Sequence, residues 1–190
     1  MAYFPLFIDL TDANCLVIGE DEAAYEKAQI LSDFGAKVSV VSKEDYTPFI
    51  LQERALVVLS TGDSTLNGEI AAMCKEGNIP VNIIGEPEKS SFTFPTYIKE
   101  QNLVGAFSSS GNSPALTQYL KNREKEILTP KLGELNEMLG RWRTPIIELF
   151  PLEASRNSAF EQLIDYALCY DGIPTDEEVE ELLMSISMAL

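Results

Sequence analysis

The first half of the chain alternates between short apolar runs and longer stretches with apolar side chains at helical spacing. An unbroken apolar run bounded by turn residues is typical of a buried strand, whereas apolar side chains three or four residues apart are typical of a helix. The runs predict strands at residues 15–18, 37–42, 55–61 and 80–84. The intervening stretches predict helices at about residues 22–33 and 65–75. Strands and helices in alternation indicate an α/β fold with a parallel, doubly wound sheet.

The second half is predicted to be mostly helical. Two more strands are predicted at residues 91–95 and 103–107, ahead of the loop "SSSGNS". Ser113 is a preferred N-cap residue and Pro114 suits the first helical position, so a helix is expected to begin there. Later helices are expected over residues 131–143, ending before Pro145, over 158–170, and after the capping box "TDEE" at 175–178.

Composition excludes several classes of function. The net charge of -16 argues against a nucleic acid or an anionic membrane as partner, since both attract positive charge. No apolar run approaches the length of a membrane span, and "MAYFPLFIDL" lacks the basic start of a secretory signal. Cys15, Cys74 and Cys169 are scattered, so we interpret them as buried thiols in a reducing cytosol. The chain has no histidine, which removes His-based triads and the commonest general base, and no metal site is predicted.

The segment "CLVIGEDEAAYEKA", residues 15–28, is a predicted strand, turn and helix. Gly19 and Ala24 occupy the first and last positions of the dinucleotide-binding pattern G-x-G-x-x-G/A, but Asp21 replaces its middle glycine. With Glu20 and Glu22, Asp21 forms an acidic run where a diphosphate would bind. Two interpretations stay open: the acids complement the helix dipole, or they also weaken binding of a dinucleotide.

Three stretches resemble the siroheme synthase N-terminal region, the precorrin-2 dehydrogenase family. They are "FPLFIDLTDANCLVIG", "FGAKVSVVS" and "PVNIIGEPEKSSFTFPTYIKEQNLVGAFSSSGNSPAL". The resemblance implies a Rossmann-like NAD-binding-type domain over residues 1–107 and a helical dimerisation region over residues 108–190. It also implies a cytoplasmic homodimer that uses NAD to oxidise precorrin-2 to sirohydrochlorin, and in some members a ferrochelatase or cobalt-inserting activity.

The resemblance also implies which residues bind the cofactor. These positions are Gly19, Asp21, Glu22, Ala23, Lys43, Glu44 and Thr61. The connection over residues 43–54 has room for one crossover only, whereas relatives have room for an extra strand. We therefore expect a sheet one strand shorter on the adenosine side. This loss and the acidic run together predict weak binding of NAD, poorer than millimolar.

The family's functional aspartate falls on Gly85, so no catalytic residue is assigned. Glu86 is the nearest carboxylate and the weak candidate to substitute for that aspartate, but we favour its interpretation as a solvated loop acid. The family loop that lines the tetrapyrrole is retained at Ser108, Ser109, Gly111, Asn112 and Ser113. Its amides are expected to bind tetrapyrrole carboxylates, with an ordinary N-cap turn as the alternative.

The resemblance favours a precorrin-2 dehydrogenase, either with or without a metal-inserting (chelatase) activity. The missing glycines and aspartate favour the alternative, a non-catalytic member that binds a tetrapyrrole or a partner enzyme without NAD turnover. Arg141 and Arg143 either pair with ligand carboxylates or interact with the helix end and surface acids.

Overall fold

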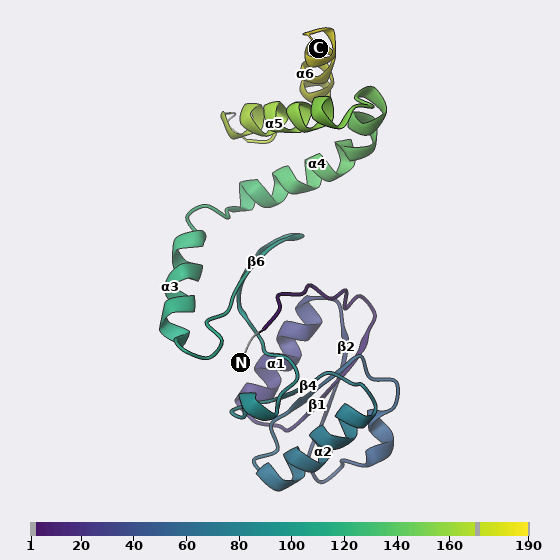
Figure 1. The fold of residues 1–190 in the computed structure, drawn as a ribbon, viewed down its shortest axis with the longest axis vertical. Helices are drawn as coiled ribbons and strands as arrows, with labels where there is room; N and C mark the ends of the chain where they lie inside the picture. Colours follow the sequence, from purple (N-terminus) through teal and green to yellow (C-terminus); the bar gives the residue numbers. More distant parts are fainter. Residues whose placement is uncertain (1–2, 170–171, 190) are drawn as a thin grey trace. The chain divides into compact units, whose positions relative to one another are not determined.

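The computed structural model describes residues 3–169 and 172–189, and the chain divides into two compact units between Phe94 and Pro95 (Figure 1). This division falls ahead of the β5–β6 hairpin and not at residue 107, because the hairpin packs against the helices that follow it. No helix in the described part of the chain is long and apolar enough to cross a bilayer.

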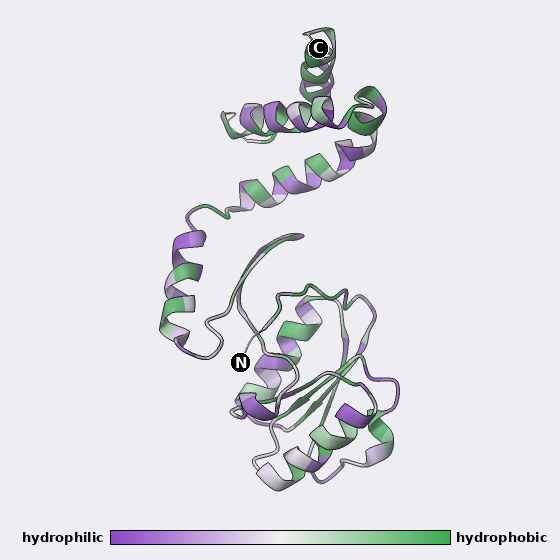
Figure 2. Cartoon of the chain, in the orientation of Figure 1, coloured by the Kyte–Doolittle hydropathy of each residue, from purple (hydrophilic) through white to green (hydrophobic). Residues whose placement is uncertain are grey.

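The first unit is a parallel sheet in the order β2-β1-β3-β4. Its strands are β1 (Asn14–Ile18), β2 (Lys37–Val41), β3 (Leu56–Leu59) and β4 (Val81–Ile83). Its helices are α1 (Glu22–Asp33) and α2 (Ser64–Glu76). β1, β3 and β4 are buried along almost their whole length, which explains the apolar runs of β1 and β3 (Figure 2). β4 also contains the buried Asn82, whose side-chain amide donates to the carbonyl of Phe92 at 3.0 Å.

The two helices cover opposite faces of this sheet. Ala24, Ala28 and Leu31 of α1 pack in one apolar cluster with Cys15 and Val17 of β1. Ile70, Ala71 and Cys74 of α2 pack in another cluster, with the alternate residues Leu16 and Ile18. The predicted α/β, doubly wound fold is therefore confirmed.

The strand order places a topological switch point between β1 and β3. The chain passes from β1 to β2 on one side and from β3 to β4 on the other. Ligands of open parallel sheets bind beyond the carboxyl ends of the strands at such a point. The loops that follow β1 and β3 consequently border the position where a ligand is expected. Between β2 and β3 the chain forms only the short 3-10 turn η1 (Pro48–Leu51).

The predicted strand at residues 91–95 is wrong. Ser90 and Ser91 lie along β4 instead, where their hydroxyl oxygens accept hydrogen bonds from the amides of Ile83 (2.8 Å) and Val81 (2.7 Å). These side-chain contacts substitute for a strand ladder after the 3-10 turn η2 (Pro87–Lys89). The next strand begins only after Pro95, as β5.

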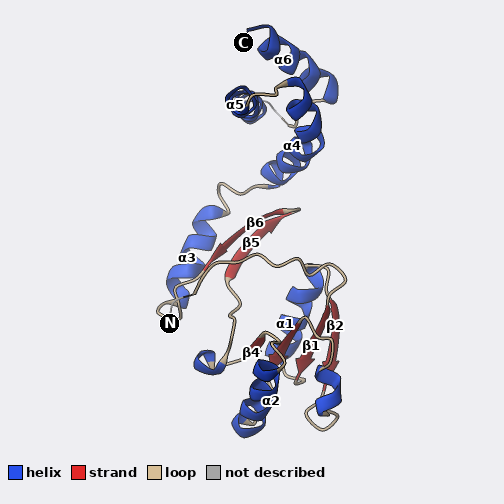
Figure 3. Cartoon of the chain, turned by 45° about the vertical axis from the view of Figure 1, so that its right-hand side comes forward, coloured by secondary structure: helices blue, strands red, loops and turns tan. Residues whose placement is uncertain are grey.

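The second unit consists of a hairpin followed by helices (Figure 3). The antiparallel strands β5 (Thr96–Glu100) and β6 (Leu103–Phe107) pack against α3 (Pro114–Glu124) and α4 (Pro130–Leu149). The remaining helices are α5 (Glu153–Cys169) and α6 (Asp176–Ala189). The predicted capping box is present, since the Thr175 amide donates to Glu178 (2.8 Å) and the Glu178 amide donates to the Thr175 hydroxyl (3.3 Å).

Two local expectations are wrong. The helix expected to stop before Pro145 continues through it to Leu149. An internal proline costs about 3 kcal/mol, but burial of the large side chains Ile146 and Phe150 beyond it offsets that cost. Cys15 and Cys74 are buried as expected, and burial raises the pKa of the Cys74 thiol to about 11, whereas Cys169 is exposed at the end of α5.

Candidate nucleotide and tetrapyrrole sites

The turn after β1 requires glycine at its first position. Gly19 is buried with φ +135°, and an added Cβ would lie 2.2 Å from the backbone carbonyl oxygen of Ser60. Its amide donates to the carbonyl of Val41 at 2.9 Å. The loop after β1 is thus held between the ends of β2 and β3, and a side chain at residue 19 has no space. This contact accounts for the one pattern glycine that the chain keeps.

Asp21 fills the N-terminus of α1 with its own carboxylate. Oδ1 accepts a hydrogen bond from the Ala24 amide at 2.7 Å, and Oδ2 accepts one from the Ser60 hydroxyl at 2.7 Å. The bond from Ser60, followed by that from Ala24, lowers the pKa of the Asp21 carboxyl below its ordinary value. Asp21 is therefore ionised at neutral pH and joins the two loops that border the switch point.

These contacts decide how well a dinucleotide fits. In dinucleotide-binding folds the diphosphate accepts hydrogen bonds from the amides at this helix terminus. Here the Asp21 carboxylate already accepts one of them, and its negative charge adds to those of the exposed Glu20 and Glu22. Ala23 is half-buried and offers no polar side chain. The residues present do not fit a diphosphate while Asp21 stays in this position.

Thr61 lies in the turn after β3 and is buried. Its hydroxyl donates to Asn67 Oδ1 at 2.7 Å and accepts from the Asp63 amide at 3.1 Å. The Asp63 carboxylate in turn caps α2 through the amides of Thr65 and Leu66. The hydrogen bonds of Thr61 are thus used to build the turn.

Lys43 and Glu44 lie in the loop after β2, at the same carboxyl edge of the sheet as Gly19. Both are exposed, and their charged groups are 3.9 Å apart. The preceding Ser42 is tied locally, because its hydroxyl donates to the Asp45 carboxylate at 2.8 Å. The parallel sheet brings these loops to one edge, as the sequence predicts, but their side chains bind one another.

Gly85 is exposed in the turn after β4, at φ +85°, and an added Cβ would meet no atom within 4 Å. Glu86 differs from the solvated acid expected there. Its carboxylate is paired with Lys89 Nζ at 2.5 Å and accepts from the Ser64 hydroxyl at 3.1 Å. The hydrogen bond from Lys89 is the main cause that lowers the pKa of Glu86. A general base works best with a pKa near the operating pH, so Glu86 is poorly suited to replace the family aspartate.

In the second unit, the loop at residues 108–113 folds upon its own hydroxyl groups. The amide of Ser110 donates to the Ser108 hydroxyl (3.2 Å), and that of Ser113 donates to the Ser109 hydroxyl (3.0 Å). The Asn112 amide donates to the Ser109 carbonyl at 3.1 Å. Three of the amides expected to bind an anion are therefore engaged within the loop.

The same loop still presents polar groups to solvent. Ser108, Gly111 and Asn112 are exposed, while Ser109 and Ser113 are half-buried. The Ser113 hydroxyl caps α3 by accepting from the Leu116 amide at 3.2 Å. Because this cap is neutral, the positive end of the α3 dipole has no counter-charge from its cap residue. At α1, by contrast, the cap is the charged carboxylate of Asp21.

Comparison with known proteins supplies the family. A family described as "Putative NAD(P)-binding" matches residues 6–96. The siroheme synthase of Tolumonas auensis is 32% identical over 85% of this chain and 38% of its own length, and that of Buchnera aphidicola is 35% identical over 86% and 38%. This chain belongs to the siroheme synthase N-terminal, precorrin-2 dehydrogenase family.

The structural comparison agrees on the fold. A solved structure described as "SirC, precorrin-2 dehydrogenase" has a TM-score of 0.74 and covers 98% of this chain and 100% of its own, at 18% identity. The chain spans about two fifths of the length of the curated siroheme synthases that it matches. The family's NAD(P)-binding-type domain is the first unit described above.

The sequence pattern identifies the family positions but not the residues that form hydrogen bonds with them. Ser60, which binds Asp21, and Ser64, which binds Glu86, carry no motif signal because they approach from other loops, whereas Lys89 lies only three residues after Glu86. Asn67, which binds Thr61, could have been found, because a buried polar residue on an otherwise apolar helix face needs a partner. Among the described residues, no group of three His, Cys, Asp or Glu side chains could hold a metal ion.

Proposed function

We propose that this chain binds the tetrapyrrole at the precorrin-2 to sirohydrochlorin stage of siroheme biosynthesis, and that it does so with little NAD turnover. Membership of the family supports the pathway and the substrate class. The proposal of little NAD turnover rests on the Asp21 carboxylate. This carboxylate accepts hydrogen bonds from the Ala24 amide and the Ser60 hydroxyl at the position where a diphosphate would bind.

The turn after β4 supports the same proposal. Gly85 has no side chain to take a proton from the macrocycle or to steer a metal ion into it. Glu86 is held ionised by Lys89 and Ser64. General-base help is worth about 10²–10⁴ in rate, so oxidation and metal insertion are both expected to be slow.

Binding of the tetrapyrrole needs neither NAD nor a carboxylate at residue 85. Precorrin-2 and sirohydrochlorin carry acetate and propionate side chains, and the loop of residues 108–113 exposes hydroxyl and amide groups at the N-terminus of α3. Neutral donors at a helix N-terminus suit carboxylates. We assign substrate contact to Ser108, Gly111 and Asn112, which are exposed.

We also propose a homodimer, with α3 at the contact between copies. Leu116, Tyr119 and Leu120 are exposed on this helix, at 52%, 60% and 37% of their surface. They recur at helical spacing and form one apolar stripe. Burial of this stripe against a second copy removes it from water.

A second candidate function is NAD-dependent oxidation of precorrin-2, the reaction that the family resemblance implies. Gly19 favours it, because the chain keeps the residue that permits the tight turn at the switch point. In that case the Asp21 carboxylate rotates away from Ser60 and Ala24 when the cofactor binds.

One set of measurements separates the two. Purified chain is titrated with sirohydrochlorin and followed by absorbance, and with NAD by calorimetry. Sirohydrochlorin formation from precorrin-2 is then followed with NAD in excess, and metal insertion is followed with Fe²⁺ or Co²⁺. We expect sirohydrochlorin binding, NAD affinity poorer than millimolar and very slow turnover. Tight NAD binding with robust oxidation would overturn the first candidate and establish the second, and failure to bind either tetrapyrrole would overturn both.

A further inference from the structure

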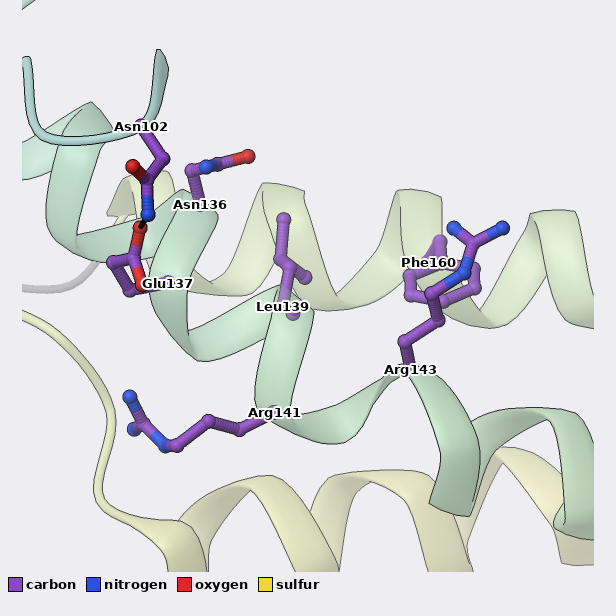
Figure 4. Close-up of a pocket in the computed structure, with 8 residues that line it drawn as sticks. Asn102, Asn136, Glu137, Leu139, Arg141, Arg143 and Phe160 are labelled. Carbon is purple, nitrogen blue, oxygen red and sulfur yellow. Dashed lines mark hydrogen bonds between the residues drawn. The ribbon is translucent and has the colours of Figure 1, made fainter. Parts of the chain in front are cut away.

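A cavity of about 640 Å³ lies over α4, entirely within the second unit (Figure 4). Its volume falls in the usual range of small-molecule pockets, about 300–1,000 Å³. It is lined at one end by Asn102, Asn136 and Glu137, and elsewhere by Leu139, Gly140, Arg141, Arg143 and Phe160. It contains Arg141 and Arg143 but none of the positions in the nucleotide loop, the turn after β4 or the loop of residues 108–113.

The polar end of the cavity is firmly built. Gly133 brings α4 so close to β5 that an added Cβ would lie 2.9 Å from the carbonyl oxygen of Glu100. Beside this contact, the Asn102 side-chain amide donates to the Glu137 carboxylate at 2.8 Å. The β5–β6 turn and α4 therefore hold this wall together.

Arg143 is a cation without a protein partner in the described part of the chain. The chain has 30 acidic residues for 14 basic ones, and four of its five arginines have a partner among the described residues. Arg54 and Arg156 donate to the backbone carbonyls of Ile50 and Pro151. Arg123 pairs with Glu126 at 3.1 Å, and Arg141 lies 3.7 Å from Asp176. Arg143 makes neither an ion pair nor a hydrogen bond within the described ranges, yet it lines the cavity. A guanidinium fork matches a carboxylate in geometry and charge.

The chemistry of the cavity changes along its length. Figure 4 shows Glu137 and Asn102 at one end, Arg143 with Phe160 at the other, and Leu139 between them. A ligand carboxylate is attracted to Arg143 and repelled from Glu137, whereas the other lining cation, Arg141, lies 3.7 Å from the Asp176 carboxylate. A flat apolar body fits against Leu139 and Phe160.

We propose that this cavity is a second ligand site, which takes a planar, conjugated polycarboxylate and anchors one of its carboxylates on Arg143. The choice of a tetrapyrrole as that polycarboxylate rests on the proposed function. The site is separate from the serine loop, because Asn102 and Ser108 lie beyond opposite ends of β6 (Leu103–Phe107), six residues and so about 20 Å of extended strand apart.

The test uses uroporphyrin III, a stable planar octacarboxylate, and the full chain. Trp142 is the only tryptophan and lies beside Arg143, so quenching of its fluorescence reports binding close to the cavity. Arg143→Gln is compared with Arg123→Gln, which removes an equal charge from an exposed arginine on α3. Calorimetry gives the dissociation constants independently of the fluorophore, and circular dichroism checks that both variants keep their helices.

We expect Arg143→Gln to raise the dissociation constant about tenfold and Arg123→Gln to change it less than twofold. Arg143→Lys should recover part of the loss, since it keeps the charge without the fork. Equal affinity of the two glutamine variants, or no binding of uroporphyrin to the wild type, would overturn the site. Arg143-dependent binding of uroporphyrin without any binding of sirohydrochlorin would leave the site standing and reject the proposed function, whereas the reverse pattern would reject only the site.

Discussion

The loop after β1 and the loop after β6 perform the same structural task with opposite chemistry. Each leads from a strand into a helix and uses left-handed backbone, at Gly19 in the first and at Ser110 and Gly111 in the second. The first helix is capped by the Asp21 carboxylate and the second by the Ser113 hydroxyl. A charged cap neutralises the helix terminus internally, whereas a neutral cap leaves it attractive to an external anion.

This difference teaches that backbone shape alone does not make an anion site. The first loop keeps the glycine of a tight turn, since Gly19 lies directly against the backbone of Ser60. Its amide at Ala24 nevertheless serves the protein's own carboxylate. The second loop keeps exposed hydroxyl and amide groups at Ser108 and Asn112 and adds no negative charge.

The largest expected effect is on the rate of oxidation, when a carboxylate is restored to the turn after β4. Gly85→Asp should raise the rate of sirohydrochlorin formation about 10²–10⁴-fold, the usual value of a general base. The turn can accept the change, because space is open around residue 85 and aspartate tolerates left-handed backbone. The rate is followed by absorbance with precorrin-2 and excess NAD. Gly85→Asn is the matched control, and equal rates for the two variants would show that a carboxylate here has no role.

The two loop glycines should differ strongly in what an added methyl group does. Gly19→Ala places Cβ against the Ser60 carbonyl and should lower the free energy of unfolding by about 3 kcal/mol or more. Gly111→Ala meets no atom within 4 Å and should cost about 1 kcal/mol, from its positive φ alone. Urea unfolding monitored by circular dichroism measures both. Similar losses would mean that the first loop is not held against β3.

Removal of the acidic run should open the first loop to the cofactor. Glu20→Gly combined with Asp21→Gly should strengthen NAD binding about hundredfold, because repulsion and the competing carboxylate both disappear. Calorimetry measures the affinity. The control is Asp12→Gly with Glu53→Gly, which removes the same charge from exposed positive-φ positions of the same unit. If neither pair changes the affinity, the short connection between β2 and β3 is the cause of weak binding.

The smallest effect distinguishes the two caps by pH. Asp21→Ala and Ser113→Ala should each lower the free energy of unfolding by about 1 kcal/mol at pH 7. The pKa of Asp21 is lowered in the folded protein, so its contribution is present above the ordinary aspartate pKa and lost as pH falls through the lowered value. The cost of Asp21→Ala should therefore shrink below about pH 4. The cost of Ser113→Ala should stay constant, and parallel pH profiles would contradict the difference in cap charge.

Local pattern was sufficient for most of the first unit. α1 was predicted over residues 22–33 and forms at Glu22–Asp33, because Ala24, Ala28 and Leu31 mark its single buried stripe. The strands were also predictable, since β1 and β3 are buried on both faces and must be apolar throughout. Where the pattern failed, at residues 91–95 and at Pro145, contacts from distant segments outweighed local preference.

The sequence by itself determined the α/β class, the positions of Gly19, Asp21, Thr61 and Gly85, and the absence of histidine chemistry. Only the tertiary structure decided what these residues bind. Ser60 binds Asp21, Ser64 binds Glu86, and Arg143 has no acidic partner among the described residues, and none of these outcomes follows from spacing along the chain. The physical reason is that a parallel sheet brings loops from separate segments to one edge, where short-range hydrogen bonds between their side chains select the partners.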